Sequence, residues 1–112
     1  MEEYVSLNQN RDFQRIYAKG KSFVSSGLVS YVLKNRKGTV RFGITTSRKT
    51  GNAVRRNRSR RVIRAAFRAV SGGVSPGYDL VFVARGRTSY LKSTEVRRLM
   101  ARHLKNAGVL KK

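Results

Sequence analysis

Residues 48–70 read R-K-T-G-N-A-V-R-R-N-R-S-R-R-V-I-R-A-A-F-R-A-V, a stretch in which every charged residue is Lys or Arg. Asn52 is a suitable N-cap, because its side-chain oxygen can accept a hydrogen bond from a backbone N–H of the first turn. No Gly or Pro follows until Gly72, so the stretch predicts one helix that begins at Ala53. At about 100° per residue the apolar residues share one side. They are Val62, Ile63, Ala66, Phe67 and Val70. The opposite side carries Asn57, Arg58, Arg60, Arg61, Arg64 and Arg68. The apolar face is suited to packing on the domain, and the basic face needs a partner from outside the chain.

The charge balance of the whole chain is equally one-sided. Its 112 residues contain 26 Lys and Arg against 5 Asp and Glu, a net charge of +21, and no acid occurs from Phe13 to Tyr78. Such a charge opposes folding unless a polyanion neutralises it, which indicates nucleic acid first and an anionic membrane second. Cysteine is absent, which excludes disulfides and thiolate chemistry and fits a cytoplasmic location. The sequence shows no signal-peptide pattern and no apolar run near the ~20 residues that a spanning helix needs.

A first helix is predicted over residues 10–19, with Asn10 as its cap. Phe13, Ile16 and Tyr17 share one face of it by their i, i+3, i+4 spacing. This spacing favours core packing for the two aromatic residues. The alternative is that their rings line a groove, because aromatic rings are stacking platforms for unpaired bases.

Patterns typical of β-strands surround the central helix. Residues 40–46 alternate apolar and polar side chains, with Val40, Phe42 and Ile44 predicted to face inward, and residues 78–84 form an apolar run typical of a strand buried on both faces. Gly43 in mid-strand indicates a bulge or a close backbone approach. A hairpin turn is predicted at 35–38.

These elements predict a single small α+β domain over residues 1–112. Their order is α-β-β-β-α-β-α, with a four-stranded mixed sheet packed by helices and with loose ends at 1–9 and 109–112. The strand–helix–strand unit should make two strands parallel, and the general rule expects a right-handed crossover. The predicted ranges are 10–19, 23–25, 28–33, 40–46, 53–70, 78–84 and 93–107.

No active site can be drawn from these residues. The acids are Glu2, Glu3, Asp12, Asp79 and Glu95, and their spacing makes neither a general acid/base pair nor a metal cluster. Asp79 opens a buried strand and is expected to bind a neighbouring Arg or a backbone N–H. The single histidine, His103, lies at the edge of the apolar stripe of the last helix and is expected to be a packing residue. We therefore expect no catalytic residue and no metal ligand in the chain.

The central stretch resembles the signature of the bacterial ribonuclease P protein component, G-N-A-V-x-R-N-R-x-[KR]-R-x-[IL]-R-x-x-F. A second motif of that family, D-F-x-x-[VI]-[FY]-x-x-G, matches the first predicted helix. The matching residues of the central signature are Gly51, Asn52, Ala53, Val54, Arg56, Asn57, Arg58, Arg60, Arg61, Ile63, Arg64 and Phe67. Those of the second motif are Asp12, Phe13, Ile16, Tyr17 and Gly20.

The resemblance implies a function in tRNA processing. The family's protein is the small subunit of a ribonucleoprotein endonuclease that removes the 5′ leader of precursor tRNA. Its RNA subunit is the catalyst and holds most of the Mg²⁺. The implied partners are this RNA and precursor tRNA, with no membrane and no required protein partner. The family fold has a left-handed crossover, which the resemblance implies here against the general rule.

Two surfaces follow from the resemblance. One binds the catalytic RNA through the helix and the residues before it, and the other is a groove for the single-stranded leader, which reverses the preference for core packing of the aromatic residues. The residues implied to bind catalytic RNA are Arg48, Lys49, Asn52, Arg56, Asn57, Arg58, Arg60, Arg61, Arg64 and, more weakly, Arg68. The residues implied for the leader groove are Phe13, Tyr17, Tyr31 and Ser47.

Other classes of basic protein stay open at this point. A ribosomal protein would be equally small and basic. A double-stranded DNA binder would place residues 53–70 in the major groove, but the chain lacks a helix-turn-helix partner. A membrane-active cationic helix is disfavoured because the sheet needs its apolar face.

Overall fold

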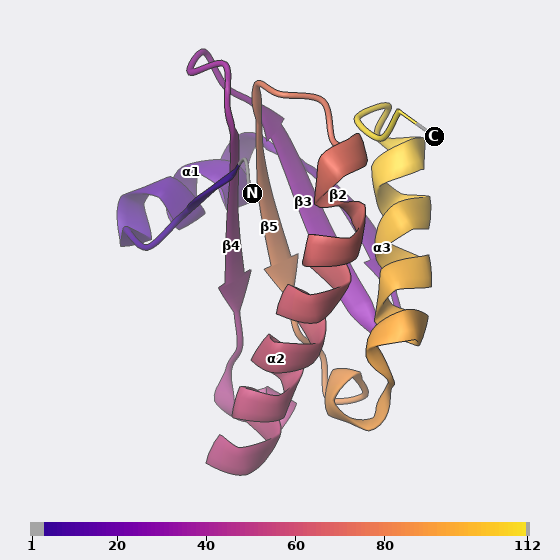
Figure 1. Ribbon diagram of the computed structural model, residues 1–112. Coiled ribbons are helices and arrows are strands. Elements are labelled where there is room, and N and C mark those ends of the chain that lie inside the picture. Colours follow the sequence, from indigo (N-terminus) through magenta and orange to yellow (C-terminus); the bar gives the residue numbers. More distant parts are fainter. Residues whose placement is uncertain (1–3, 112) are drawn as a thin grey trace.

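The computed structural model describes residues 4–111, apart from the side chains of Tyr4 and Arg48. A twisted sheet separates α1 on one face from α2 and α3 on the other (Figure 1). The strands are β1 (Tyr4–Ser6), β2 (Lys21–Ser25), β3 (Leu28–Lys34), β4 (Val40–Thr45) and β5 (Tyr78–Val83). The α-helices are α1 (Asn10–Lys19), α2 (Ala53–Val70) and α3 (Ser93–Asn106), and the short 3-10 turns are η1 (Arg48–Thr50), η2 (Ser71–Gly73) and η3 (Thr88–Tyr90).

The sheet has five strands in the order β1-β4-β5-β3-β2. Strands β1, β4 and β5 are parallel to one another, β3 pairs antiparallel with β5, and β2 pairs antiparallel with β3. The prediction of four strands is therefore wrong, because residues 4–6 form the additional strand β1. The predicted loose segment before residue 10 is wrong for these residues as well. Residues 1–3 of that segment lie outside the described residues. A strand of three residues is too short to show a period. Its pairing with β4 continues at Leu7, whose N–H donates to the Phe42 carbonyl at 2.7 Å.

The turn at 35–38 joins β3 to β4, but the predicted hairpin is wrong because these strands do not pair. Strand β5 lies between them, antiparallel to β3 and parallel to β4. Local sequence marks the turn through Gly38, whose φ is +70°. It cannot show that a strand forty residues later enters between the two arms, because strand pairing is a non-local property.

The β4–α2–β5 unit has a left-handed crossover. In Figure 1 the arrows of β4 and β5 both point down, α2 crosses in front of the sheet, and β5 lies to the right of β4. With both strands turned to point up and α2 still in front, β5 lies to the left of β4, which is the left-handed arrangement. The family expectation is confirmed here and the general right-handed rule fails.

The main core lies between the sheet and the α2–α3 layer. Its centre is aromatic: the rings of Phe42 and Phe67 stack with centroids 4.3 Å apart, and Phe82 lies 5.6 Å from Phe67. Helix α3 adds Val96, Met100 and Leu104, all fully buried. The predicted apolar face of α2 is confirmed by this packing.

The chain after α3 belongs to this core as well. Gly108, with φ +77°, turns the backbone, Val109 is fully buried, and the Lys111 N–H donates to the Gly73 carbonyl at 2.8 Å. The predicted loose end is therefore wrong for residues 109–111. A glycine followed by two apolar residues is the local signal for such a return.

A second, smaller core lies under α1. Ile16 and Val81 are fully buried, and Leu7 packs beside them. Gly43 permits the close approach that its position predicts, because a Cβ there would lie 2.6 Å from the Phe13 ring. The predicted Asn10 cap is wrong: Gln9 is the N-cap, and its side chain makes no capping hydrogen bond.

A buried carboxylate fixes α1 to the sheet. Asp79 accepts two hydrogen bonds from Arg41 at 2.8 Å, one from Arg15 at 2.9 Å and one from Asn35 at 2.7 Å. Burial alone would raise the pKa of Asp79, but the hydrogen bonds from Arg41 and Asn35 and the charges of both arginines outweigh it and lower the pKa. The expectation that Asp79 binds a neighbouring Arg is confirmed.

In the part of the chain that the structure covers, every helix is too short or too polar to cross a lipid bilayer.

Candidate nucleic-acid interface

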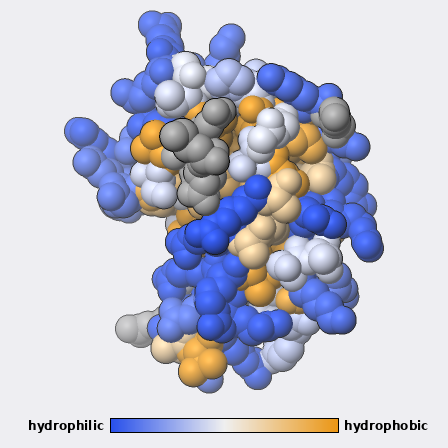
Figure 2. All heavy atoms as spheres, in the orientation of Figure 1, coloured by the Kyte–Doolittle hydropathy of each residue, from blue (hydrophilic) through white to orange (hydrophobic). Residues whose placement is uncertain are grey.

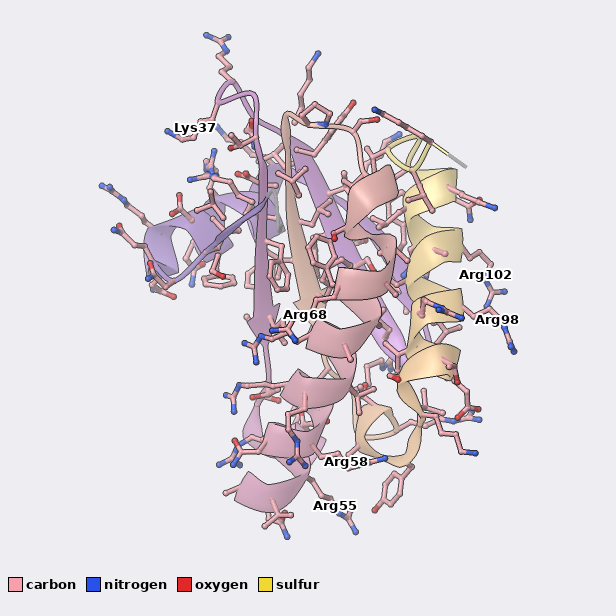
Figure 3. All side chains as sticks on the ribbon, in the orientation of Figure 1. Lys37, Arg55, Arg58, Arg68, Arg98 and Arg102 are labelled. Carbon is pink, nitrogen blue, oxygen red and sulfur yellow. The ribbon has the colours of Figure 1, made fainter. Side chains whose placement is uncertain are left out.

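The surface of α2 that faces away from the core is mainly basic from Arg55 to Arg68, and Val54 is exposed at the start of the helix. Figure 2 shows strongly hydrophilic residues over this helix, and Figure 3 shows Arg55, Arg58 and Arg68 projecting from it. Arg56 and Arg60 are half-buried at its margin. The other predicted members of this basic face are exposed, namely Asn57, Arg58, Arg61, Arg64 and Arg68. The two faces of the helix divide as its periodicity predicts.

The carboxylates of Asp12 and Asp79 are taken by Arg15 and Arg41, on the far side of the sheet from α2. The side chain of Glu95 accepts from the Lys92 N–H at 2.9 Å at the start of α3. These acids are thus occupied elsewhere, and the α2 surface has a strong positive potential.

Some side chains predicted to bind RNA also hold the start of α2 in place. The Asn52 side chain accepts from the Arg55 N–H at 3.0 Å, as its predicted capping role requires. Arg56 Nη1 donates to the Gly51 carbonyl at 2.9 Å. Arg58 Nε donates to the Ser89 carbonyl at 2.7 Å and so ties α2 to η3. These bonds fix the direction in which the basic face points.

The turn before α2 is fixed from the other side. Gly51 has φ +134°, a conformation that strains any side chain, and a Cβ there would lie 2.8 Å from the Arg55 side chain. Thr50 is buried, and its Oγ1 accepts from the Ser47 N–H at 3.2 Å. Lys49 is exposed beside it. Arg48 begins η1, and its side chain lies outside the described part.

Three of the predicted groove residues lie together on the α1 face of the sheet. The ring centroids of Phe13 and Tyr17 are 6.4 Å apart, and Tyr17 meets Tyr31 edge-on at 5.0 Å. The Tyr17 hydroxyl donates to Thr45 Oγ1 at 2.9 Å. All three rings pack against the small core and stay half-exposed, so core packing and an open aromatic edge occur together.

Ser47 does not join this cluster, because it lies exposed beyond the end of β4. It lines a separate hollow with Lys49 and Arg85. The register connects the two places: Thr45, Val83, Val29 and Val24 form one row across four strands on the α1 face.

This sheet row is open to solvent in part. Val29 and Val83 are half-buried and Val24 is 64% exposed. The α1 face of the sheet thus carries aromatic rings at one end, an apolar floor, and a hollow with the cations Lys49 and Arg85 at the other end. Sequence reasoning missed this floor and Arg85. The alternation of β3 and the position of Arg85 directly after β5 are the signals that could have found them.

His103 is buried against the sheet, as a packing residue should be. Its Nε2 and Nδ1 lie 2.7 Å from the hydroxyls of Ser25 and Ser30. Burial, with a smaller contribution from the charge of Arg102, lowers the pKa of His103. Both ring nitrogens are therefore engaged in holding α3 on β2 and β3.

Within residues 4–111 no three His, Cys, Asp or Glu side chains gather as they would around a metal ion.

A small α+β domain with an exposed cationic helix face and a separate aromatic cluster belongs to the class of RNA-binding proteins. The family model described as Ribonuclease P matches residues 1–108, and the chain belongs to this family.

Proteins similar to this chain agree with that assignment. The ribonuclease P protein component of Clostridium kluyveri is 39% identical over 107 residues, which cover 94% of this chain and 96% of the relative. That of Clostridioides difficile is 46% identical over 80 residues, 70% of each chain. Among solved structures, the Staphylococcus aureus RNase P protein superposes with a TM-score of 0.82 at 33% identity, covering 94% of this chain and 96% of that one. The Thermotoga maritima RNase P protein gives 0.79 at 33% identity, covering 90% and 96%.

Proposed function

We propose that this chain is the protein subunit of ribonuclease P, which binds the catalytic RNA and the 5′ leader of precursor tRNA and assists Mg²⁺-dependent removal of the leader. The observation that carries the proposal is the separation of two surfaces by the sheet. The basic face of α2 lies on one side and the aromatic cluster of Phe13, Tyr17 and Tyr31 on the other. A protein with two such faces can hold two RNAs against their mutual repulsion.

In this proposal the catalytic RNA binds along α2 and the turn before it. Arginine suits the role because its planar guanidinium can meet two phosphate oxygens at once. Binding mainly through phosphates also predicts a steep salt dependence: neutralising ~6–10 phosphates makes affinity fall by roughly 10³–10⁵ between about 50 and 200 mM salt. The proposed contacts are Arg48, Lys49, Asn52, Arg56, Asn57, Arg58, Arg60, Arg61, Arg64 and Arg68.

The leader lies in the groove on the α1 face. The half-exposed edges of Phe13, Tyr17 and Tyr31 offer stacking surface for unpaired bases, which is sequence-tolerant because every base has a π-face. Ser47, with Arg85 beside the same hollow, supplies polar and cationic groups for the leader's backbone. Leaders of different sequence can therefore bind in the same way.

The chain supplies no nucleophile, base or metal ligand to the reaction in this proposal. The RNA subunit is the catalyst and supplies the Mg²⁺ sites that cleavage requires. The residues of this chain position the leader and neutralise phosphate charge near the cleavage site. No protein partner is required, and a function on newly made precursor tRNA places the chain in the bacterial cytoplasm.

The test is a cleavage assay at low Mg²⁺. The chain is mixed with its host's catalytic RNA and 5′-labelled precursor tRNA, and a lysine homopolymer of matched charge is the control. We expect faster cleavage at the mature 5′ end with the chain than with RNA alone or with the homopolymer. A rate no different from that of RNA alone would refute the proposal, and co-sedimentation with a ribosomal subunit would then support the ribosomal alternative.

A further inference from the structure

Tyr90 presents an aromatic side chain to solvent beside the basic end of α2. It is the last residue of η3 and is 62% exposed. Its neighbours Ser89 and Leu91 are buried. Neither Tyr90 nor Arg55 beside it belongs to the residues that the family motifs single out.

The backbone under this ring is firmly held. The Tyr90 N–H donates to the Arg87 carbonyl at 3.0 Å. Arg58 Nε donates to the Ser89 carbonyl at 2.7 Å, and the buried hydroxyl of Thr88 donates to the Gly27 carbonyl at 2.7 Å. The ring therefore projects from a fixed support between α2 and the sheet, so little order has to be gained when something binds to it.

The surroundings of the ring are cationic. The guanidinium carbon of Arg55 lies 4.8 Å from the ring centroid, in a cation–π contact. Figure 3 shows Arg55 and Arg58 at this same end of α2. A shallow hollow between α2 and the start of α3 is lined by Arg58, Arg61 and Lys92. The acid nearest in sequence, Glu95, is used in capping α3.

We infer that Tyr90 and Arg55 form a stacking platform for one unpaired base of the RNA that docks on α2, with the adjoining phosphates in the hollow of Arg58, Arg61 and Lys92. The inference rests on the proposed function and extends the RNA interface from α2 to η3. The positive charge of the arginine and lysine side chains around the ring favours binding of a polyanion. An exposed aromatic ring beside such cations is suited to stacking on a base of a nucleic acid whose phosphates the cations contact. The stacking does not depend on base identity.

The first test compares two substitutions at one position. Tyr90→Phe keeps the ring, whereas Tyr90→Leu keeps an apolar side chain and removes the π-face. We expect Tyr90→Leu to bind the catalytic RNA about 5- to 150-fold more weakly, the range that one base–aromatic stack supplies, and Tyr90→Phe to bind within about twofold of the parent chain. Thermal unfolding of both variants should match the parent, because the ring is exposed. Equal RNA affinity of Tyr90→Leu and Tyr90→Phe would overturn the inference.

The second test observes the contact directly. The chain has no Trp, so Tyr90→Trp introduces a single fluorescent reporter. Catalytic RNA should quench this indole and protect it from acrylamide. The matched control is Val5→Trp, at a 51% exposed position on β1. Strand β1 is the edge strand opposite β2, and the indole at residue 5 should stay accessible to acrylamide when the RNA is bound. An indole at residue 90 that remains as accessible as the control would also overturn the inference.

The outcomes separate this inference from the proposed function. If the parent chain does not bind the catalytic RNA at all, both fail. If Arg61→Ala with Arg64→Ala weakens RNA binding while Tyr90→Leu does not, the α2 interface stands and the platform at η3 alone is wrong.

Discussion

The arginines on the two faces of the sheet differ in whether they have a carboxylate partner. Under α1, Arg15 and Arg41 converge on the buried carboxylate of Asp79, with Asp12 at the margin. On α2, Arg61 and Arg64 are exposed on a helix that contains no acid. In a chain with a net charge of +21, abundance of arginine alone does not mark a binding site. The difference in carboxylate partners separates arginines that hold the fold from arginines that are left for a polyanion.

The largest expected effect is on the α1 side. Asp79→Asn keeps the size of the side chain but leaves Arg15 and Arg41 without their buried counter-charge. Loss of one member of a buried ion pair typically costs about 3–5 kcal/mol, and we expect a loss of this size in the free energy of unfolding at pH 7. Urea unfolding followed by far-UV circular dichroism measures it.

The control is Asp12→Asn, whose carboxylate is partly exposed and lies 3.4 Å from Arg15 and 3.8 Å from Arg41, so it should cost no more than about 1 kcal/mol. Acid should mimic the Asp79 substitution. Because the pKa of Asp79 is lowered from 3.8 in the fold, its contribution is complete above that value and disappears as pH falls through the folded pKa. Equal stabilities of the two Asn variants would show that Asp79 does not organise this face.

A second prediction addresses the groove on the same face. In Gly43→Ala the new Cβ would lie 2.6 Å from the Phe13 ring, so the ring must move. Overpacking of this kind costs about 1–3 kcal/mol of stability. If the leader binds beside Phe13, affinity for precursor tRNA should fall while affinity for mature tRNA, which has no leader, stays the same.

Gly72→Ala is the matched control, because no atom lies within 4 Å of a Cβ there and its φ is not positive. It should alter neither stability nor RNA binding. Unchanged discrimination between precursor and mature tRNA in Gly43→Ala would remove the Phe13 end of the groove from the leader site.

The structure of the α2 side can be predicted from the sequence far better than that of the α1 side. The cap at Asn52, the buried Phe67 and the exposed Arg61 all follow from local spacing, because a helix buries one stripe whatever it packs against. The aromatic positions Phe13 and Tyr17 follow from spacing only as neighbours, and their meeting with a tyrosine of β3 does not.

What sequence could not predict depends on distant pairing. The alternation of β4 places Arg41 away from the main core, but only the position of α1 makes that second face an interior where Arg41 meets Asp79. Strand β1 and the insertion of β5 between β3 and β4 have the same origin. Tyr90 is exposed because of the way η3 is held against α2 by the hydrogen bond from Arg58 to Ser89. A strand and a loop separate these two elements in the sequence, so no local pattern predicts the exposure.

The smallest change in the fold, and the most direct test of the α2 face, comes from Arg61→Ala combined with Arg64→Ala. Arg58 is a poorer choice than these two because its hydrogen bond to Ser89 holds η3 in place. Both substituted side chains are exposed, so stability should change by no more than about 0.5 kcal/mol. Removal of two phosphate contacts should lower the slope of log affinity against log salt by about 2 and weaken catalytic-RNA binding by roughly tenfold at moderate salt.

The charge-matched control for this double variant is Arg36→Ala with Lys37→Ala, at the exposed turn between β3 and β4. It removes the same net charge, so a purely non-specific attraction of RNA to a polycation would weaken equally in both variants. If the contact is specific to α2, RNA affinity and its dependence on salt should decrease only in the Arg61 and Arg64 variant. Titrations of both variants with labelled catalytic RNA across salt concentrations decide between these outcomes. Indistinguishable slopes would mean that missing carboxylate partners do not identify the arginines that bind RNA.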